Sequence, residues 1–251
     1  MKSGYVSIVG RPNVGKSTLL NCILETHLAI TSNKAGTTRN IIEGIYEDLD
    51  SQIIFVDTPG IHKPINKLGN ILNKKAYSTS ENVDLILFLV DIEAGIGKGD
   101  MFVLEKLKEE NLPIILVLNK VDRVNKDKLL ELIMKYKDLY DFSEIFPISA
   151  LKNDNVNALI KTIKKYLPNE GKIFESDMFT NISTNFYISE IIREKVLRKT
   201  REEVPHSVTC VVEKRIDNKD KEIIQACIIV DRESIKKIIV GKNASMLKSI
   251  G

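Results

Sequence analysis

The chain has 251 residues, of which 43% are hydrophobic and 28% charged, and its formal net charge is +3. This composition is typical of a soluble globular protein with room for one large domain or two smaller ones. No apolar run reaches the roughly 18 residues of a membrane-spanning helix. The first predicted strand begins too close to the N-terminus for a signal peptide, so we expect neither a span nor a leader.

The charge is distributed unevenly along the chain. Residues 1–182 hold 23 lysines and arginines against 24 acidic residues, whereas residues 183–251 hold 14 against 10. The basic excess in the last quarter favours an acidic partner there, such as nucleic acid. The cysteines and histidines lack metal-ligand spacing, and we expect the cysteines to be reduced thiols in a cytoplasmic protein.

The first predicted strand, residues 5–9, leads into a loop of the form G-x-x-x-x-G-K-[ST], which binds phosphate. The loop consists of Gly10, Arg11, Pro12, Asn13, Val14, Gly15, Lys16, Ser17 and Thr18. Its glycines allow a tight turn that points successive N–H groups at phosphate oxygens. Lys16 brings positive charge to the outer phosphates, and the Ser17 hydroxyl suits Mg²⁺. A predicted helix at 16–25 presents its positive dipole end to the same anion.

Strands and helices then alternate along the chain. We predict strands at residues 41–47, 52–56, 85–90, 114–118 and 145–148, and helices at 101–110, 126–139 and 156–167. The first two of these strands form a hairpin. Apolar strands that alternate with helices predict an α/β fold with a mainly parallel sheet covered on both faces. Ligands of such sheets bind beyond the carboxyl ends of the strands.

The motif Asp57-Thr58-Pro59-Gly60 follows one of these strands. Asp57 can hold Mg²⁺ directly or through water, and the Gly60 N–H can meet a terminal phosphate that approaches closely. The alternative is a strand-ending turn, since Pro-Gly marks turns in any case.

Two further strand-end motifs predict recognition of guanine. They are Asn119-Lys120-Val121-Asp122 and Ser149-Ala150-Leu151-Lys152. Asp122 offers two oxygens to the adjacent N–H donors of guanine, an edge that adenine lacks. Asn119 can tie the base-binding loop to the phosphate loop, and the Lys120 stem can cover the flat face of the base. The Ala150 N–H can meet the guanine carbonyl oxygen.

In this order, and with Thr37 and Thr38, the motifs resemble those of translation-factor-class GTPases. The string from Gly10 to Thr18, followed by Gly-Thr-Thr-Arg at 36–39, resembles the Era branch of that class. The resemblance implies that GTP or GDP is the cofactor, together with Mg²⁺. Residues 31–40 would form a first switch, and residues 57 to about 80 a second.

The resemblance also assigns roles. Lys16, Thr38 and Gly60 are implied in catalysis, and Mg²⁺ would be held by Ser17, Asp57 and Thr38, with Thr37 as the adjacent alternative to Thr38. GTP would order both switches, and hydrolysis would release them.

Two positions affect the expected hydrolysis rate. Ile61, counted with the nucleotide-binding residues, stands where many small GTPases carry glutamine, and it can neither donate nor accept a hydrogen bond. Intrinsic hydrolysis is therefore expected to be slow. Related GTPases use the residue equivalent to Asn13 to hold K⁺ near the phosphates. The alternative is that Asn13 is a turn residue that tolerates unusual φ and ψ.

A second domain is expected after the nucleotide-binding part. We predict a GTPase domain at 1–168, a polar linker at 169–182 and a second domain at 183–251. The second domain reads as a helix at 189–201, strands at 207–214 and 223–230, and helices at 234–240 and 245–250. This order resembles a type II KH domain, which clamps single-stranded nucleic acid on a G-x-x-G loop. The last helix is unfinished at residue 251, so we expect an incomplete KH domain.

Residues 238–251 resemble the KH loop and following helix of the Era family. The resemblance implies RNA contacts at Gly241, Lys242, Asn243, Ala244 and Lys248. Ala244 replaces the second glycine of the loop, which puts close backbone contact there in doubt. The alternative is an ordinary helix–helix turn with solvated lysines.

The resemblance implies a GTP-controlled switch that binds small-subunit (16S) ribosomal RNA near its 3′ end and acts in assembly of the 30S subunit. It implies a monomer without DNA as a partner, in the cytoplasm or peripherally at the membrane. The alternatives are an RNA-binding scaffold with an idle nucleotide site, another Era-related GTPase of ribosome or tRNA maturation, and an ATP-dependent enzyme.

Overall fold

The structure is a computed structural model, and it describes residues 1–251 except 35, 62–66, 79–82, 202–203 and 219–220. The chain divides into two compact units. The first comprises Met1–Ala29 and Thr38–Asn181, and the second comprises Ile30–Thr37 and Ile182–Gly251. Among the described residues, no helix combines the length and the apolar character needed to cross a bilayer.

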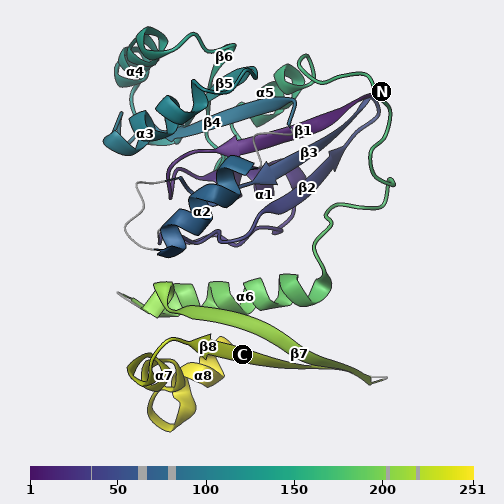
Figure 1. The fold of residues 1–251 in the computed structure, drawn as a ribbon, viewed down its shortest axis with the longest axis vertical. Helices are drawn as coiled ribbons and strands as arrows, with labels where there is room; N and C mark the ends of the chain where they lie inside the picture. The colour runs from purple at the N-terminus through teal and green to yellow at the C-terminus, as the bar shows by residue number, and fades with distance from the viewer. Residues whose placement is uncertain (35, 62–66, 79–82, 202–203, 219–220) are drawn as a thin grey trace. The chain divides into compact units, whose positions relative to one another are not determined.

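The first unit is built on a mostly parallel sheet, as predicted (Figure 1). Its strands are β1 (Lys2–Val9), β2 (Ile42–Glu47), β3 (Ser51–Asp57), β4 (Leu85–Asp91), β5 (Ile114–Asn119) and β6 (Glu144–Ile148). Their order is β2-β3-β1-β4-β5-β6, and β2 pairs with β3 in the antiparallel sense while the other pairs are parallel. The carboxyl ends of the parallel strands therefore share one edge, where the predicted motifs lie.

Helices cover both faces of this sheet (Figure 1). They are α1 (Lys16–Leu24), α2 (Lys67–Ser78), α3 (Lys98–Leu107), α4 (Lys126–Leu139) and α5 (Val156–Ile163). Side chains of α2, α3 and α4 share one core with alternate residues of β4 and β5. α1 and α5 contact one another, and α1 contacts β2 and β3.

Three helices of the first unit differ from the sequence-based expectation. α3 begins and ends three residues before the predicted 101–110. α2 was not predicted, and among its described side chains Leu72 and Ala76 are buried, one turn apart. α5 ends at Ile163, four residues before the predicted end, and the chain continues in tight turns closed by the N–H groups of Lys165 and Tyr166.

The segment predicted as a polar linker is bonded to the edge of the first unit's sheet. The Ile45 N–H of β2 donates to the Phe179 carbonyl oxygen at 2.9 Å, and the Thr180 hydroxyl donates to the Glu43 carbonyl oxygen at 2.7 Å. These bonds satisfy backbone groups that an open edge strand would leave to solvent.

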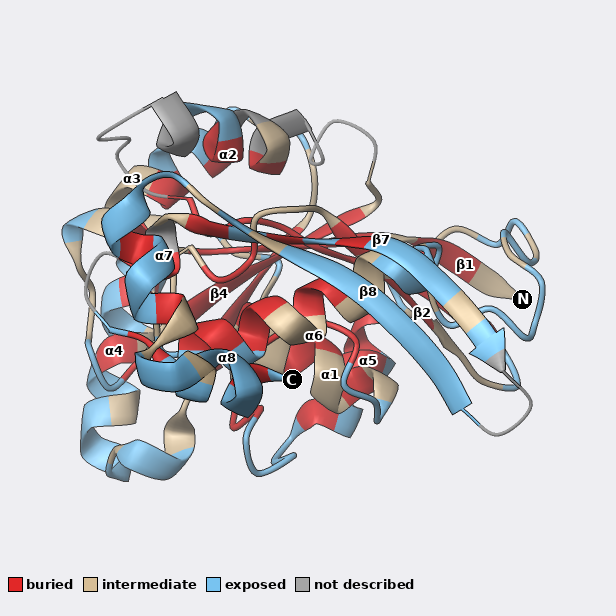
Figure 2. Ribbon diagram, turned by 90° about the horizontal axis from the view of Figure 1, so that it is seen from below, coloured by how far each residue is buried: buried red, intermediate tan, exposed pale blue. Residues whose placement is uncertain are grey.

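The second unit has the elements of the predicted KH fold. They are α6 (Thr184–Lys199), β7 (Val208–Asn218), β8 (Lys221–Val230), α7 (Glu233–Val240) and α8 (Ser245–Ile250). β7 and β8 are antiparallel, and a bulge lies between Val212 and Lys214. The core joins all three helices to β7 through buried residues that include Val196, Ile239 and Ile250. β8 is exposed over most of its length (Figure 2).

α6 begins five residues before the predicted start. The Ser183 hydroxyl caps it by accepting a hydrogen bond from the Phe186 N–H at 3.3 Å, which satisfies a donor that the first turn leaves open. The apolar residues of this helix were expected to face a core; Val196 and Leu197 are buried, whereas Ile188, Ile191 and Ile192 are half-buried. The charged residues Glu190 and Arg193 are buried as well, which the pattern did not predict.

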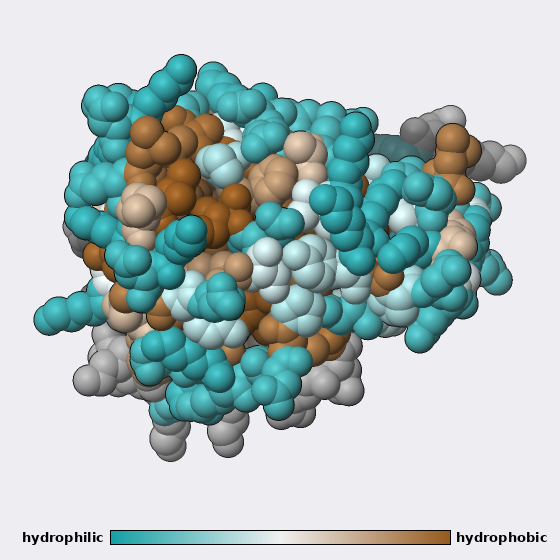
Figure 3. All heavy atoms as spheres, turned by 90° about the horizontal axis from the view of Figure 1, so that it is seen from above, coloured by the Kyte–Doolittle hydropathy of each residue, from teal (hydrophilic) through white to brown (hydrophobic). Residues whose placement is uncertain are grey.

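The surface seen in Figure 3 is mainly hydrophilic, with a patch of apolar side chains at the left, on the side where Figure 1 places α3 and α4. Exposed apolar side chains of α4 include Leu130 and Met134, each 61% exposed.

Candidate functional site

The phosphate-binding loop connects β1 to α1, and close packing explains its glycines. A Cβ on Gly10 would lie 2.3 Å from the Leu89 carbonyl oxygen. Gly15 has a φ of 103°, and a Cβ there would lie 2.3 Å from Asn119 Nδ2. Neither position has room for a side chain, and the left-handed φ of Gly15 also favours glycine.

Lys16 lies inside the loop. Its side chain is 6% exposed, and its ammonium donates to the carbonyl oxygens of Gly10 and Arg11, both at 3.1 Å. Burial lowers the pKa of Lys16 to about 8, against the opposing effect of the Asp57 charge. The Lys16 ammonium thus donates to neutral carbonyl acceptors. Charged phosphate oxygens would form stronger hydrogen bonds with it in their place.

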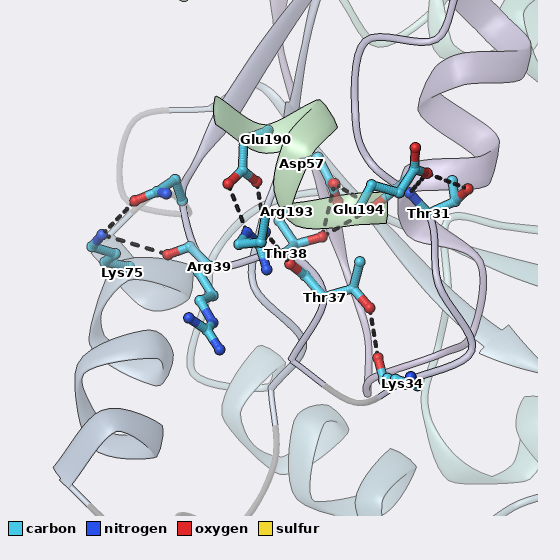
Figure 4. Close-up of polar contacts among 12 residues, drawn as sticks. Thr31, Lys34, Thr37, Thr38, Arg39, Asp57, Lys75, Glu190, Arg193 and Glu194 are labelled. Carbon is cyan, nitrogen blue, oxygen red and sulfur yellow. Dashed lines mark hydrogen bonds and ion pairs between the residues drawn. The ribbon is translucent and has the colours of Figure 1, made fainter. Parts of the chain in front are cut away.

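Ser17, Thr38 and Asp57 come together as predicted for a magnesium site. The Ser17 hydroxyl lies 2.7 Å from Asp57 Oδ2 and 3.0 Å from the Thr38 hydroxyl. The Thr38 hydroxyl is 3.4 Å from the same Oδ2 (Figure 4). Burial raises the pKa of Asp57, opposed by the Lys16 charge and by hydrogen bonds from the two hydroxyls.

The Asp57 carboxylate has a spare buried oxygen. Oδ1 is buried and has no hydrogen-bond partner within the described part of the chain. A buried acceptor without a partner costs free energy that a cation, or the water on it, would recover. Together with two hydroxyl oxygens, this donor set suits Mg²⁺, which prefers oxygen ligands.

The side chains of Thr58 and Ile61 point into the protein. The Thr58 hydroxyl donates to the Ile8 carbonyl oxygen at 2.9 Å, and the Ile61 side chain is 1% exposed in the core. The Ile61 N–H donates to the Gly10 carbonyl oxygen at 3.1 Å. Between them are Pro59 and Gly60, and a Cβ on Gly60 would lie 2.7 Å from the backbone nitrogen of Pro12. This loop therefore packs on the phosphate loop through its backbone, while the Thr58 and Ile61 side chains are buried within the first unit.

Asn119 connects the phosphate loop to the two loops predicted to bind the base. Its Nδ2 donates to the Val14 carbonyl oxygen at 2.8 Å, and its Oδ1 accepts from the Ala150 N–H at 3.0 Å. The Ser149 hydroxyl donates to Asp122 Oδ1 at 2.6 Å. The Ala150 N–H, predicted to meet guanine, is thus already bonded to Asn119, and it would have to share or exchange that bond to reach the base.

Thr18 and Ala150, which belong to different motifs, line one hollow of about 380 Å³ on the surface of the first unit. Leu151 and Cys22 line it as well. Its other lining residues lie mostly at the end of α1 and just after it, namely Asn21, Glu25, Thr26 and His27, so the hollow extends away from the phosphate loop.

Asp91 is a site residue that the motif analysis did not include. Its Oδ2 lies 2.5 Å from the Lys120 ammonium, which orients the stem predicted to cover the base. Lys120 itself has a φ of 71°. The signal was in the sequence, since Asp91 ends β4 and so stands at the same sheet edge as the other motifs.

Asp100 was also missed. It is 1% exposed at the start of α3, where Oδ1 lies 3.1 Å from Arg11 Nε and Oδ2 accepts the Gly97 N–H at 2.9 Å. Burial raises the pKa of Asp100, opposed by the Gly97 N–H and by the Arg11 charge. Arg11 thereby fixes the phosphate loop to α3.

Asn13 is exposed and has a φ of 66°. The left-handed conformation is one that asparagine tolerates, as the turn interpretation expects. A role of Asn13 in holding K⁺ stays a prediction.

The predicted RNA-binding loop lies between α7 and α8. Gly241 has φ 70° and ψ 173°, and a Cβ there would lie 2.8 Å from the Met246 Cβ. Asn243 and Ala244 have φ values of 52° and 59°. Lys242 is exposed at this loop, as is Lys248 on α8. Ala244 thus adopts the left-handed conformation that glycine prefers.

Comparison with known proteins agrees with this geometry. The model of a family described as 50S ribosome-binding GTPase matches residues 5–120, and a KH domain model matches residues 203–251. A solved structure of Era in complex with MgGDPNP and nucleotides 1506–1542 of 16S ribosomal RNA is 42% identical, with a TM-score of 0.96. The match covers 100% of this chain and 86% of that one.

Two other solved structures are also similar. A variant of Aquifex aeolicus Era bound to GDP and AlF4⁻ has the same identity of 42%, TM-score of 0.96 and coverage of 100% and 86%. Elongation factor SelB from Methanococcus maripaludis, in complex with a GTP analogue, is 25% identical with a TM-score of 0.55. That match covers 71% of this chain and 36% of the SelB chain.

The fold and the strand-end motifs define a P-loop GTPase joined to a KH domain. The similarity to Era extends over the whole chain at 42% identity. The chain therefore belongs to the Era family, and it is a GTPase.

Proposed function

We propose that this chain binds GTP and Mg²⁺ at the carboxyl ends of the first unit's strands, and that it acts as a slow switch on small-subunit ribosomal RNA. The observation that carries the proposal is the Asn119 side chain, which bonds the phosphate loop at Val14 and the base loop at Ala150. One residue thus aligns the predicted phosphate site with the predicted guanine site, and Ser149 orients Asp122 beside them.

Each site residue has a physical task in this proposal. Backbone N–H groups of the phosphate loop and the Lys16 ammonium bind and neutralise the phosphates. Ser17, Asp57 and Thr38 hold the metal, and Mg²⁺, when bound, supplies charge neutralisation at the transferred phosphoryl group. The Asp122 carboxylate selects guanine by accepting its paired N–H donors.

Hydrolysis is proposed to be slow because Ile61 does not help to orient water. Its side chain is in the core of the unit, and no rearrangement of an aliphatic side chain provides a hydrogen bond. Slow hydrolysis suits a switch protein that keeps its GTP-bound conformation until GTP is hydrolysed.

The KH loop is the proposed RNA contact. The similar Era structure contains 16S ribosomal RNA, and we propose the same class of target, near the 3′ end, for this chain. Support comes from the exposed Lys242 and Lys248 and from the left-handed φ values of Asn243 and Ala244 in the loop. We propose a role in 30S assembly in the cytoplasm. Peripheral membrane association and the monomeric state stay predictions.

The guanine assignment is tested with Asp122→Asn. An amide in place of the carboxylate removes one acceptor, so we expect GTP affinity to fall by roughly a hundredfold or more and xanthosine triphosphate to become the better ligand. Asp127→Asn, the same change on an exposed residue at the start of α4, is the matched control and should leave both affinities unchanged. An Asp122→Asn protein that still prefers GTP would reject the assignment. Wild-type preference for ATP would favour the ATP-dependent alternative.

The RNA assignment is tested by binding to a 3′-terminal 16S segment, to the same nucleotides in scrambled order and to tRNA, all at one stated salt concentration. Lys242→Ala should weaken binding, and Lys161→Ala, an exposed lysine on α5, should not. Equal binding of the scrambled RNA would contradict a sequence-specific target, and tighter binding of tRNA would favour the tRNA-maturation alternative.

A further inference from the structure

Charged side chains are buried on one face of α6. Glu190, Arg193 and Glu194 are 6%, 1% and 5% exposed, and their spacing of three and four residues places them side by side on the helix. A buried ion pair is weak evidence for stability, because well-packed apolar residues often serve as well. These charges are therefore better explained by what they hold, which is the segment Ile30–Thr37 of the same unit.

Arg193 is fixed by Glu190 and bonds the end of that segment (Figure 4). Its Nε and Nη2 donate to the two carboxylate oxygens of Glu190 at 2.7 and 2.6 Å. Nη2 also donates to the Thr37 carbonyl oxygen at 2.5 Å. This bidentate ion pair fixes the plane of the guanidinium. The N–H that donates to the Thr37 carbonyl oxygen therefore already has a fixed direction.

The rest of the segment is held by the same helix. Glu194 Oε1 accepts from the Thr31 N–H at 2.8 Å and from the Thr31 hydroxyl at 3.2 Å. The Lys34 ammonium donates to carbonyl oxygens at the C-terminal end of α6. Within the segment, the Thr37 hydroxyl donates to the Lys34 carbonyl oxygen at 2.6 Å. Thr31, Lys34 and Thr37 are thus each bonded to α6.

The Thr37 carbonyl belongs to the same planar peptide unit as the nitrogen and Cα of Thr38. Holding that oxygen therefore orients the backbone of Thr38, whose hydroxyl lies 3.0 Å from the Ser17 hydroxyl in the first unit. We propose that Arg193 is a positioning residue for GTP hydrolysis, which acts by setting the peptide that presents Thr38 to the magnesium site. This proposal rests on the proposed function, in which Thr38 joins Mg²⁺ when GTP is bound.

The test compares Arg193→Gln with Lys199→Gln in the full chain. Both remove one positive charge from α6, but Lys199 is exposed. We expect Arg193→Gln to lower the single-turnover rate at saturating GTP by about tenfold and to raise the Mg²⁺ concentration for half-maximal rate. GDP affinity should stay within about twofold, because the phosphate and base loops are untouched. Lys199→Gln should leave all three quantities unchanged.

A double-mutant cycle with Thr38→Ala separates positioning from general destabilisation. If Arg193 acts through Thr38, adding Arg193→Gln to Thr38→Ala slows hydrolysis no further. Arg193→Lys keeps the charge but loses the planar fork, so it should show a smaller loss, and it carries the test if Arg193→Gln does not fold. A wild-type rate in the folded arginine variants, or additive losses in the cycle, overturns the positioning role alone. A wild-type chain that hydrolyses no GTP overturns the proposed function and the positioning role together.

Discussion

Replacing Ala244 with glycine should stabilise the KH loop. Ala244 has φ 59° and ψ 23°, the left-handed region, which costs an L-residue roughly 1–2 kcal/mol. Glycine removes this cost but adds about 0.5–1 kcal/mol through the freedom of the unfolded chain. The balance is a gain of about 0.5–1 kcal/mol for Ala244→Gly, which corresponds to roughly a two- to fivefold increase in protection of the α8 amides from hydrogen exchange.

Two matched variants show whether the gain comes from the backbone conformation. Asn243 has φ 52° and ψ 35°, but asparagine visits this region at a lower cost, so Asn243→Gly should change stability little. Ala226 lies within β8, and Ala226→Gly should destabilise by about 0.5–1 kcal/mol. Hydrogen exchange and denaturant unfolding of the full chain measure all three variants under the same conditions.

Loss of stability in Ala244→Gly as large as in Ala226→Gly would refute the assignment of strain to Ala244. The RNA consequence follows from the same geometry. Without the methyl group, an RNA backbone can approach the loop more closely, so affinity for the 16S segment should rise or stay equal.

Three further predictions concern the first unit. If Asn13 holds K⁺, hydrolysis should be several-fold faster in KCl than in NaCl and Asn13→Ala should remove the difference; equal rates would leave the turn interpretation. Gly15→Ala should weaken binding of both GTP and GDP in calorimetry by tenfold or more, because its Cβ would lie 2.3 Å from Asn119 Nδ2. Burial alone would raise the pKa of Asp48, but hydrogen bonds from Lys164 and Ser51 hold this pKa well below its usual range. This stabilisation is present above the unfolded pKa of about 3.9 and is lost as pH falls below it, so Asp48→Asn should cost about 1–2 kcal/mol at pH 7 and progressively less in acid; a pH-independent cost in urea unfolding would contradict it.

The parallel sheet could be predicted because its strands are buried on both faces and so read as continuous apolar runs. β4 and β5 are buried along almost their whole length and were found to within one residue at either end. α2 was missed for the opposite reason. It is rich in lysine and asparagine, and the burial of Leu72 and Ala76 is too sparse a pattern to distinguish a helix from a polar loop.

The candidate site divides in the same way. Residues within a motif, such as Ser17 and Asp122, could be proposed from local sequence chemistry, and their roles stay predictions. Residues that act through a distant partner were missed, because no spacing rule connects positions far apart in sequence. Asp91 lies 29 residues from Lys120, and Arg193 lies 156 residues from Thr37.

The predicted first switch is divided between the two structural units. A single domain boundary placed along the sequence therefore cannot separate the two units. The resemblance to the Era family implied that residues 31–40 form one element, the first switch. In the structure, Ile30–Thr37 packs with α6, whereas Thr38 bonds Ser17 in the other unit. The peptide bond after Thr37 therefore joins a segment held by buried charges of the KH unit to a hydroxyl of the predicted magnesium site. A residue such as Arg193 can affect hydrolysis without touching nucleotide, because the peptide plane transmits its orientation in a single step.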